Sequence, residues 1–333
     1  YFDVSSWPTY GKLSGRRVDE LLEGTRIEVN PEKRHPADFA LWKRAEPEHI
    51  MRWPSPWGVG YPGWHAECSA MAAKYLGLPF DIHGGGVDNK FPHHESEIAQ
   101  SEAAYDVPLC RYWLHNNMVT VGGQKMGKSL GNAIYLKDLF KRFDPLTVRY
   151  FILNSHYRSP LDFTDGALSA AQRGLQRLHN AVRAVRAAMA EASEGGVQPA
   201  VAESAATARQ SFEEAMDDDF NTAGALAALF ELARESNSIL AAGQFTRQEM
   251  EALDSVFRET GGQVLGVIPD RLEEPRVAGL EKALIELLIE LRQEFRAARE
   301  WDQADAIRDR LAALGVKLED RPEGTAYRLE APG

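Results

Sequence analysis

The sequence predicts an α/β fold that is followed by an α-helical bundle and a small mixed α/β domain at the C-terminus. Three observations support this prediction. Residues 80–83 have the length and composition of a short buried strand, and they run into three glycines. After about residue 134, apolar residues recur at helical spacing. Residues 316–320 and 325–329 then alternate between apolar and polar side chains, which is typical of paired strands.

Composition and charge narrow the range of functions. The 333 residues allow two or three domains with sizeable cores, and the net charge is −11. This acidic balance argues against a general nucleic-acid binder, although a local basic strip would still serve a specific nucleic-acid partner. The sequence shows no apolar run long enough to cross a membrane, no secretory signal, and too few cysteines for a disulfide framework. We therefore expect a cytoplasmic protein with no membrane partner.

The first part of the chain is predicted to change from irregular to α/β structure. Residues 1–57 have many prolines and tryptophans and little periodicity. From residue 58 to about residue 120, the expected elements are the strand at 80–83, a helix from about Pro92 to Ala104, and strands at 112–115 and 118–121. Loops at the ends of parallel strands form the ligand sites of α/β folds, so functional residues are expected near the three glycines.

The later part of the chain is predicted to be helical. Helices are expected at 136–143, 146–155, 166–191, 201–216, 222–242, 246–261, 278–300 and 302–313. Asn221 is placed to cap the helix that begins at residue 222, and Gly315 follows the last helix in a helix-stop position. In the helix at 278–300, an apolar stripe is expected to face the core. Its members are Leu280, Leu284, Leu287, Leu288, Leu291 and Phe295.

A candidate metal site combines Cys68, in WHAECSAM, with His93 and Glu97, in FPHHESEIAQ. His93 and Glu97 are four residues apart, so on a helix their side chains lie on one side, one turn from each other. A thiolate, an imidazole and a carboxylate that converge on one point suit zinc. Taken alone, such residues are more often a surface pair and a buried apolar thiol. His94 and Glu95 are adjacent alternatives whose side chains project elsewhere on the helix.

A second motif about 30 residues further on strengthens the metal-site hypothesis. Lys125 and Lys128 lie three residues apart in KMGKS, with Gly122 and Gly123 before them and Gly131 after them. Two lysines on a glycine-flanked loop can move and can place positive charge on a polyphosphate. By itself, this loop would be equally consistent with an ordinary exposed basic turn.

Together these motifs resemble a known family. KMGKSLGN is similar to the Lys-Met-Ser-Lys-Ser loop of class I aminoacyl-tRNA synthetases, while GYPGWHAECSAM and HGGGVDNKFPHHESEIAQ resemble cysteinyl-tRNA synthetases in particular. Further similar stretches are DFALWKRAEP (38–47), SPWGVGYPGWH (55–65), RYWLHNNMV (111–119), RSPLDFTD (158–165), DDDFNTAGALAALFELARE (217–235) and WDQADAIRDRLAALGVKLED (301–320). A chance match over so many separated blocks is implausible.

The sequence also departs from this family. It lacks the His-x-Gly-His signature that holds the ATP phosphates, and it lacks the second zinc-binding Cys that precedes this signature in the family. Because the chain also opens on Tyr1, we expect it to be the C-terminal two-thirds or so of such an enzyme. Gly127 replaces the usual Ser, which adds backbone freedom to the lysine loop. Cys110 is the one other thiol, and we expect it to be buried and structural, although it is also the one alternative in this sequence for the absent thiolate ligand.

The resemblance implies a division of the chain into parts of a class I synthetase. The fold would be part of a class I Rossmann-type nucleotide-binding domain, followed by the helical bundle and the C-terminal domain. The expected parts are the remainder of an insertion (connective) region (1–57), the second half of the Rossmann-type catalytic domain with the zinc site (58–120), the lysine loop with connecting helices (121–165), a helical bundle on the stem and anticodon side of the tRNA (166–270) and an anticodon-binding domain (276–333).

The activity implied by the resemblance is that of a cysteine–tRNA ligase. ATP-dependent activation of L-cysteine to cysteinyl-adenylate would be followed by transfer to tRNA(Cys), and the enzyme would be a monomer that uses ATP with magnesium. This chemistry depends on positioning and on neutralising charge. Lys128 would touch the ATP phosphates with support from Lys125. Asp88 would bind the ribose hydroxyls, and Gly85 and Gly86 would let the backbone approach the nucleotide.

The resemblance also assigns the amino-acid pocket and the zinc. Trp64 would wall the pocket and His65 would lie close to the nucleotide. Zinc on Cys68, His93 and Glu97 would select the thiol of cysteine over the hydroxyl of serine, because zinc prefers soft sulfur. Two helical segments carry candidate basic strips for the tRNA, and each could equally be a solvated helix face. Their members are Arg173, Arg177, Arg183 and Arg186 on one, and Arg292, Arg296 and Arg299 on the other.

Two other functions remain open at this point. One is an ATP-dependent ligase of the same ancestry that joins cysteine to an amino-sugar glycoside in thiol biosynthesis. Such ligases tend to lack the final segment that this chain has at 301–320. The other is a non-catalytic module that binds only tRNA or zinc, which would fit a chain without the His-x-Gly-His half.

Overall fold

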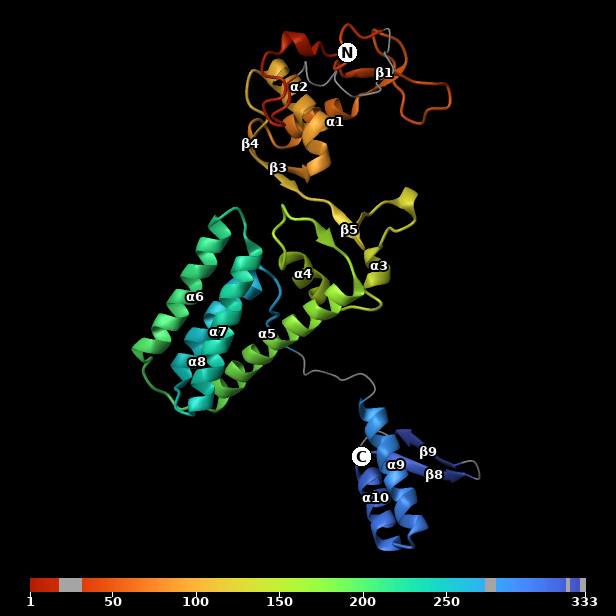
Figure 1. The fold of residues 1–333 in the computed structure, drawn as a ribbon, viewed down its shortest axis with the longest axis vertical. Helices are drawn as coiled ribbons and strands as arrows, with labels where there is room; N and C mark the ends of the chain where they lie inside the picture. Colours follow the sequence, from red (N-terminus) through yellow and green to blue (C-terminus); the bar gives the residue numbers. More distant parts are fainter. Residues whose placement is uncertain (18–31, 273–279, 322–323, 330–333) are drawn as a thin grey trace. The chain divides into compact units, whose positions relative to one another are not determined.

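The computed structural model describes residues 1–17, 32–272, 280–321 and 324–329. The chain divides into two compact units, Tyr1–Asp270 and Arg271–Gly333 (Figure 1). The first unit contains α/β elements and a helical bundle, and the second contains a helix pair and a hairpin. This mixed α/β and helical architecture confirms the predicted fold class. Among the described residues, no helix combines the length and the apolar character that a membrane span requires.

The α/β part is built on two parallel strands, β3 (Phe80–Gly86) and β4 (Cys110–Asn116), with helix α2 (Glu95–Tyr105) in the connection between them. Both strands confirm predictions from the sequence. Phe80 lies opposite Cys110, and the register continues to Gly86 opposite Asn116. Parallel strands need a crossover of this kind, and their carboxyl ends meet at one edge of the sheet. The loops after Gly86 and Asn116 are thus neighbours, in the position where α/β folds bind ligands.

Two helices in the α/β part differ from the sequence prediction. Helix α1 (Trp64–Tyr75) packs against α2 but was not predicted, because its apolar and polar residues are not segregated on opposite faces. Helix α2 begins at Glu95 rather than near Pro92. The backbone of Phe91 is extended (φ −141°, ψ 135°), which interrupts the helical path, and η4 (Lys90–His94) forms a short π-helical turn instead.

The N-terminal residues pack onto α2. A short helical turn, η1 (Val4–Ser6), and the antiparallel pair β1 (Trp42–Arg44) and β2 (Gly60–Pro62) are its regular elements among the described residues. A small core of Val4, Tyr10, Phe39 and Ala99 joins this segment to α2. The N-terminal residues therefore help to fix the helix that carries Glu97.

A three-stranded sheet in the order β6-β5-β7 carries the lysine loop. Its strands are β5 (Val119–Val121), β6 (Gln124–Lys125) and β7 (Leu161–Asp162), of which β5 was predicted. The loop continues into the short helical turn η5 (Lys128–Leu130). Helices α3 (Leu136–Leu139) and α4 (Pro145–Leu153) follow, shorter than predicted but at the predicted places.

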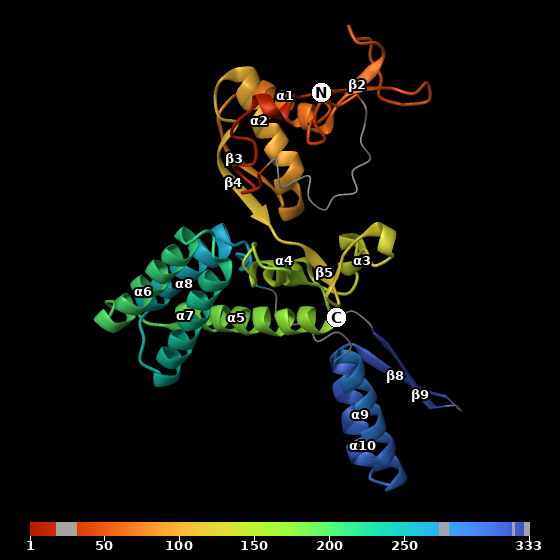
Figure 2. The same ribbon diagram turned by 45° about the horizontal axis from the view of Figure 1, so that its top comes forward.

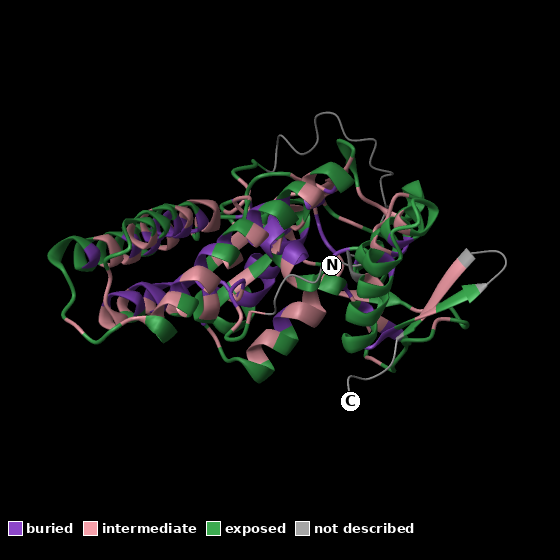
Figure 3. Cartoon of the chain, turned by 90° about the horizontal axis from the view of Figure 1, so that it is seen from below, coloured by how far each residue is buried: buried purple, intermediate pink, exposed green. Residues whose placement is uncertain are grey.

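The helical bundle confirms the helices that were predicted from the apolar periodicity of the sequence. It contains α5 (Asp165–Glu191), α6 (Pro199–Asp217), α7 (Thr222–Ala242), α8 (Arg247–Val256) and the π-helical η6 (Phe257–Val264). Figure 2 shows these helices side by side, and Figure 3 shows buried residues gathered along their facing sides. As predicted, Asn221 caps α7, since its side chain accepts a hydrogen bond from the N–H of Gly224 at 2.9 Å.

The C-terminal unit pairs two helices with a hairpin. They are α9 (Leu280–Ala297), α10 (Trp301–Ala313), β8 (Val316–Arg321) and β9 (Gly324–Leu329), and the strands are antiparallel. The predicted start of the first helix at residue 278 lies outside the described residues. Both strands and the second helix confirm predictions.

The predicted core face of α9 is wrong in part: Leu288 packs against the core, but three other members of the stripe are exposed. Leu284, Leu287 and Leu291 are 48%, 49% and 36% exposed, whereas Ile285, Ile289 and Arg292 are buried. The core packs Ile285 and Ile289 against α10 and β8. An arginine can occupy a buried position because Asp320 receives two of its N–H groups, at 2.8 and 2.9 Å. A prediction from apolar spacing assumes that arginine is exposed. It therefore assigned the core of α9 to a neighbouring face of the helix.

Candidate functional site

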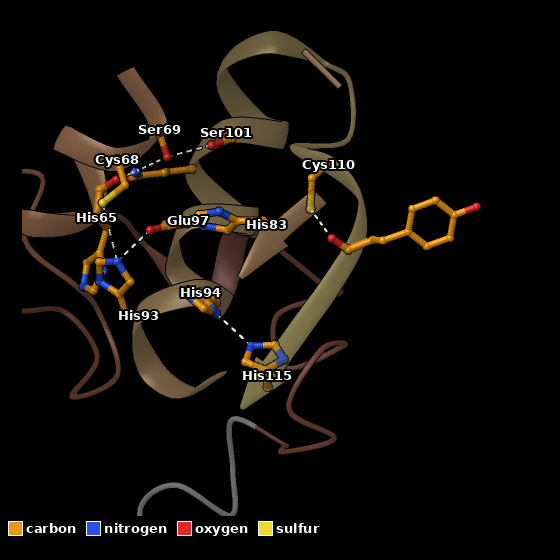
Figure 4. A network of polar contacts seen from close by, with 12 residues as sticks. His65, Cys68, Ser69, His83, His93, His94, Glu97, Ser101, Cys110 and His115 are labelled. Atoms are coloured by element: carbon orange, nitrogen blue, oxygen red, sulfur yellow. Dashed lines mark hydrogen bonds and ion pairs between the residues drawn. The ribbon is translucent and has the colours of Figure 1, made fainter. Parts of the chain in front are cut away.

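The structure brings Cys68, His93 and Glu97 together (Figure 4). Cys68 lies on α1, His93 lies just before α2, and Glu97 lies one turn further along. The Nε2 atom of His93 is 3.6 Å from Sγ of Cys68 and 2.6 Å from Oε1 of Glu97. His93 and Glu97 are buried, and Cys68 is half-buried. The packing of α1 on α2 thus creates the three-donor cluster that the sequence predicted.

The electrostatics of this cluster suit a cation. Oε1 of Glu97 is buried and has no hydrogen bond of acceptable geometry with a described residue, despite its close approach to His93. Burial raises the pKa of the Cys68 thiol to about 12, and the nearby Glu97 carboxylate adds to this effect. A divalent cation would stabilise the thiolate and would also give the free Oε1 atom a partner. The donor set of sulfur, nitrogen and oxygen therefore fits zinc.

Glu97 is oriented from its other side by His83. Nε2 of His83, on β3, lies 2.6 Å from Oε2 of Glu97, whose side chain is 1% exposed. Burial raises the pKa of the Glu97 carboxyl, but the contacts with His83 and His93 outweigh burial and bring the pKa to about 2. The carboxylate is therefore ionised and held in one orientation. Residues that hydrogen-bond to a metal ligand from its other side usually have this effect.

His65 orients His93 in a similar way. The two Nδ1 atoms are 2.9 Å apart, so one of them must carry the shared proton. With a cation in the cluster, a proton on Nδ1 of His93 would leave its Nε2 lone pair available to that cation. Burial, and after it the neighbouring His93, lowers the pKa of His65 to about 4, so His65 is neutral and can accept this proton. The structure thus places His65 beside the metal cluster.

Trp64 covers the same cluster. Its indole ring lies 3.9 Å from the ring of His93, centroid to centroid, and its side chain is 58% exposed. A hollow of about 450 Å³ borders Trp64 and His65, and Phe39 and Asp38 also line it. This position suits the wall of an amino-acid pocket next to the metal cluster.

The side chains of His94 and Glu95, the two adjacent alternatives as metal ligands, point in different directions. His94 forms a second group with His83 and Glu97, and its Nδ1 lies 2.8 Å from Nε2 of His115. Glu95 turns away and accepts hydrogen bonds from the backbone N–H groups of Leu13 and Ser14. Glu95 therefore ties the N-terminal segment to α2 and is not part of the metal cluster.

A buried hydrogen-bonded clamp joins α1 to α2 beside the cluster. Gln100 donates to Oγ of Ser69 at 2.6 Å and to the backbone carbonyl of His65, and Ser101 donates to Ser69 at 2.7 Å. Ser69 follows Cys68 directly, so this clamp helps to set the distance between the thiol and Glu97 on α2. The clamp was not predicted from the sequence, although Ser69 stands next to Cys68 and Gln100 stands three residues after Glu97.

The lysine loop lies close to Asp88. Nζ of Lys125 is 3.3 Å from Oδ2 of Asp88, and both side chains are more than half exposed. Lys128 forms no ion pair with any residue in the described ranges. Asn132 closes the loop, since it accepts the N–H of Gly127 at 2.9 Å and donates to the carbonyl of Lys125 at 3.1 Å. Gly127 itself is extended (φ −164°), a conformation that any residue adopts.

The glycines after β3 have a structural requirement of their own. A Cβ atom on Gly85 would lie 2.6 Å from the ring of His94, and one on Gly86 would lie 2.5 Å from Oδ1 of Asp88. Side chains at these positions would displace His94 and Asp88, which flank the candidate site. The structure thus explains both glycines without a nucleotide, and their proposed contact with one stays a prediction.

Other predicted residues are tied into the fold. Cys110 is buried, as predicted, beside Phe80 and Leu109, and takes part in no metal group of the described residues.

The predicted basic strips are not continuous. Nε of Arg186 lies 2.7 Å from Asp254, and Arg292 is buried against Asp320, so neither is free for phosphates.

The chain resembles known proteins over its whole length. Residues 1–173 match the family described as tRNA synthetases class I (C) catalytic domain, and residues 211–269 match the DALR domain. The cysteine–tRNA ligase of Thermus thermophilus is 49% identical over 331 residues, which are 99% of this chain and 68% of that protein. That of Deinococcus radiodurans is 47% identical over 332 residues, which are 98% of this chain and 66% of that protein.

A solved structure agrees with these matches at the level of the fold. The leucyl-tRNA synthetase of Agrobacterium radiobacter K84, solved in a ternary complex with tRNA, aligns with a TM-score of 0.51 and 17% identity. The alignment covers 65% of this chain and 33% of that one. A class I catalytic domain followed by a DALR domain defines the class: this is a class I aminoacyl-tRNA synthetase chain.

The particular family follows from the relatives. The chain belongs to the cysteine–tRNA ligase family, of whose members it spans about two thirds of the length (68% and 66% of the two named). The similarity extends over 99% of the chain, and so includes the segment at 301–320. The alternative of an amino-sugar ligase is therefore not favoured.

Proposed function

We propose that this chain carries the zinc-dependent amino-acid site of an enzyme that activates L-cysteine with ATP and transfers it to tRNA(Cys). The observation that carries this proposal is the convergence of Cys68, His93 and Glu97 beside Trp64 and against His83 of β3. Membership of the cysteine–tRNA ligase family gives the reaction class, which uses ATP and magnesium.

Zinc would be held by Cys68, His93 and Glu97, which leaves a position open for the incoming amino acid. Zinc bound there supplies a soft acceptor that favours a thiolate over a hydroxyl group. The protein side chains orient this site: His65 fixes the tautomer of His93, and His83 fixes the carboxylate of Glu97. A pocket of shape alone separates cysteine from serine poorly, so this chemical contrast is the basis of selection.

The nucleotide side of the reaction would use the lysine loop. Lys128, with Lys125 in support, would neutralise the negative charge that builds up on the ATP phosphates. Asp88 would accept hydrogen bonds from the ribose hydroxyls. Its ion pair with Lys125 would have to open for this, at a small cost because both groups are exposed. Gly85, Gly86 and His65 would border the nucleotide.

The remaining expectations concern the wider enzyme. The bundle at 166–270 would lie along the tRNA stem, and the unit after residue 276 would bind the anticodon. The enzyme would act as a monomer in the cytoplasm. Exposed arginines that remain available for phosphate contacts in these parts are Arg173 and Arg177 on α5, and Arg299 just after α9, whereas Arg296 pairs with Asp320 at 2.7 Å.

Calorimetric titration of the zinc-loaded chain with L-cysteine and L-serine tests the proposal directly. We expect L-cysteine to bind and L-serine to bind more than about 100-fold more weakly, because only the thiol gains a metal bond. A chelator-treated sample should lose most of the preference. Equal binding of the two amino acids, or a preference that survives removal of the metal, would show that zinc does not select the substrate.

A further inference from the structure

An apolar hollow of about 590 Å³ is bordered by β5, by helix α4 and by the turn between α6 and α7. Met126, Ile134, Leu136, Ile152 and Phe220 are among the side chains that line it. Its volume lies within the range of about 300–1,000 Å³ that is usual for small-molecule sites. None of the residues assigned above to cysteine, zinc, ATP or tRNA lines this hollow. The proposed function therefore leaves it without a role.

The lining of the hollow carries no formal charge. Among the described residues that line it there is no aspartate, glutamate, lysine or arginine. A phosphate or carboxylate group would lose its water there and would gain no opposite charge in return. Two of the hydroxyl groups at the hollow are already used within the protein. Thr222 donates to the backbone carbonyl of Leu153 at 2.6 Å, and Tyr157 donates to Asp219 at 2.7 Å. The lining thus suits a neutral ligand with few hydrogen-bonding groups.

The turn that brings Phe220 to the hollow is strained. Asp219 and Phe220 both have a φ of 55°, a left-handed conformation that is unfavourable for a bulky side chain. Hydrogen bonds from Tyr157 and from Nε of Arg158, at 2.7 and 2.8 Å, hold Asp219 in this conformation. Phe220 is nevertheless 47% exposed, so burial within the chain does not explain why an aromatic residue occupies this turn. Strained residues of this kind cluster at ligand sites, which is a second indication that the hollow binds a molecule.

We propose that the hollow is a binding site for a neutral, largely aromatic small molecule. Phe220 and Tyr157 offer aromatic rings, the thioether of Met126 adapts to the shape of the ligand, and Ile152 adds an aliphatic wall. The site is separate from those proposed for cysteine, ATP and tRNA, and the inference does not depend on them. The adenine ring of ATP is also flat and neutral, but it carries a triphosphate for which no described residue of this lining is a cation.

Methyl NMR of the whole chain with naphthol, a neutral bicyclic aromatic with one hydroxyl group, tests this site. Ile134 and Ile152 line the hollow and report on it, while Ile50 is 98% exposed, does not line it and serves as the reference. We expect the methyl resonances of Ile134 and Ile152 to shift and to saturate as naphthol is added, and that of Ile50 to stay in place. ATP in a second titration should leave the affinity for naphthol unchanged.

Two variants separate binding from structure. Phe220→Gly removes the ring and relieves the turn, because glycine adopts a positive φ readily. We expect the affinity for naphthol to fall about 3- to 10-fold, with a Tm no lower than that of the wild type. Ile152→Glu places a charge at the hollow and should weaken binding at least about 10-fold, measured at Ile134. Ile50→Glu is the matched control and should bind as the wild type does.

Several results would overturn the proposal. They are the absence of shifts at Ile134 and Ile152, an equal shift at Ile50, or an unchanged affinity in both variants. A lower Tm of Phe220→Gly with wild-type affinity would give the ring a purely structural role. Displacement of naphthol by ATP would assign the hollow to the nucleotide.

Discussion

The α1–α2 pair and the α5–α8 bundle are both packed helices, but their contact surfaces are opposite in character. In the bundle, most of the buried residues are apolar, as with Leu178 and Leu229, which are both 0% exposed. In the α1–α2 pair, most of the buried stretch from residue 93 to residue 101 is polar, including Glu97 at 1% and Ser101 at 0%. Burial of apolar side chains stabilises the contact surface of the bundle. The contact between α1 and α2 is stable only when each buried polar group has a hydrogen-bonding or ionic partner.

This difference indicates what each region is for. A buried carboxylate or imidazole costs free energy unless hydrogen bonds or a cation compensate for it. The α1–α2 pair accepts this cost and obtains a fixed set of metal donors in return, while the bundle supplies stability. Buried polar and ionisable side chains are therefore concentrated in the region where the chemistry is expected.

Removing a metal donor should give the largest effect. In His93→Ala, we expect the affinity for L-cysteine to fall by more than about 100-fold and the discrimination against L-serine to be lost, because a direct ligand matters more than its outer partners. Titration calorimetry measures both. His49→Ala, a partly exposed histidine away from the cluster, is the control. If His93→Ala keeps its selectivity for L-cysteine, the α1–α2 pair does not have the metal-binding function proposed for it.

Truncating the bundle core should affect stability and leave the metal site alone. Leu229→Ala is expected to lower the free energy of unfolding by about 2–5 kcal/mol through lost burial and the cavity left behind. The surface variant Val264→Ala, at a position that is 53% exposed, should change it little. Denaturant unfolding and zinc content are measured together. A loss of zinc in folded Leu229→Ala would show that the two regions are not independent.

Weakening the clamp should affect the metal site more than the fold. Gln100→Ala removes the hydrogen bonds to Ser69 and to the carbonyl of His65. We expect zinc affinity to fall about 10-fold, because such outer positions typically contribute 10–100-fold. Competition with a chromogenic chelator measures it. Gln176→Ala, which removes a bond to Asn180 on α5, is the control and should bind zinc normally. Equal affinities for both variants would assign the clamp a purely structural role.

The smallest effect should lie in the C-terminal unit. Hydrogen bonds from Arg292, and then from Thr325, hold the pKa of Asp320 below its ordinary value. A lowered pKa means that this contribution to stability is complete above about pH 4 and is lost as the pH falls through the folded-state value. Asp320→Asn should lose about 1 kcal/mol near neutral pH and should show less acid sensitivity.

Urea unfolding followed through the NMR resonance of the Trp301 indole N–H measures this effect, with Asp309→Asn as an exposed control. If Asp320→Asn keeps the full acid sensitivity of the wild type, the ion pair with Arg292 does not stabilise this unit.

The same comparison explains what the sequence could predict. Helices of the bundle follow from apolar spacing because burial is their dominant interaction. Helix α1 has no such spacing, since its inner side carries Ser69 and Cys68 and faces other polar residues. The apolar face of α9 was misplaced for a related reason: a paired Arg292 occupies a buried position that periodicity assigns to leucine.

The candidate site was predicted in part. Cys68, His93 and Glu97 were identified from residue type, spacing and resemblance, and the structure brings them together. His83 and the clamp were not assigned roles in the metal site, because their contacts join residues on different elements and depend on the tertiary packing. Spacing in one helix can reveal two ligands, but it cannot reveal what holds them in place.

Elemental analysis of the purified chain for zinc is the most direct test of the central claim, that a thiol, an imidazole and a carboxylate form a metal site. We predict one zinc per chain, lost in Cys68→Ala and kept in Cys110→Ala, whose thiol is buried away from the cluster. A wild-type chain that binds no zinc, or zinc retained in full by Cys68→Ala, would contradict the account.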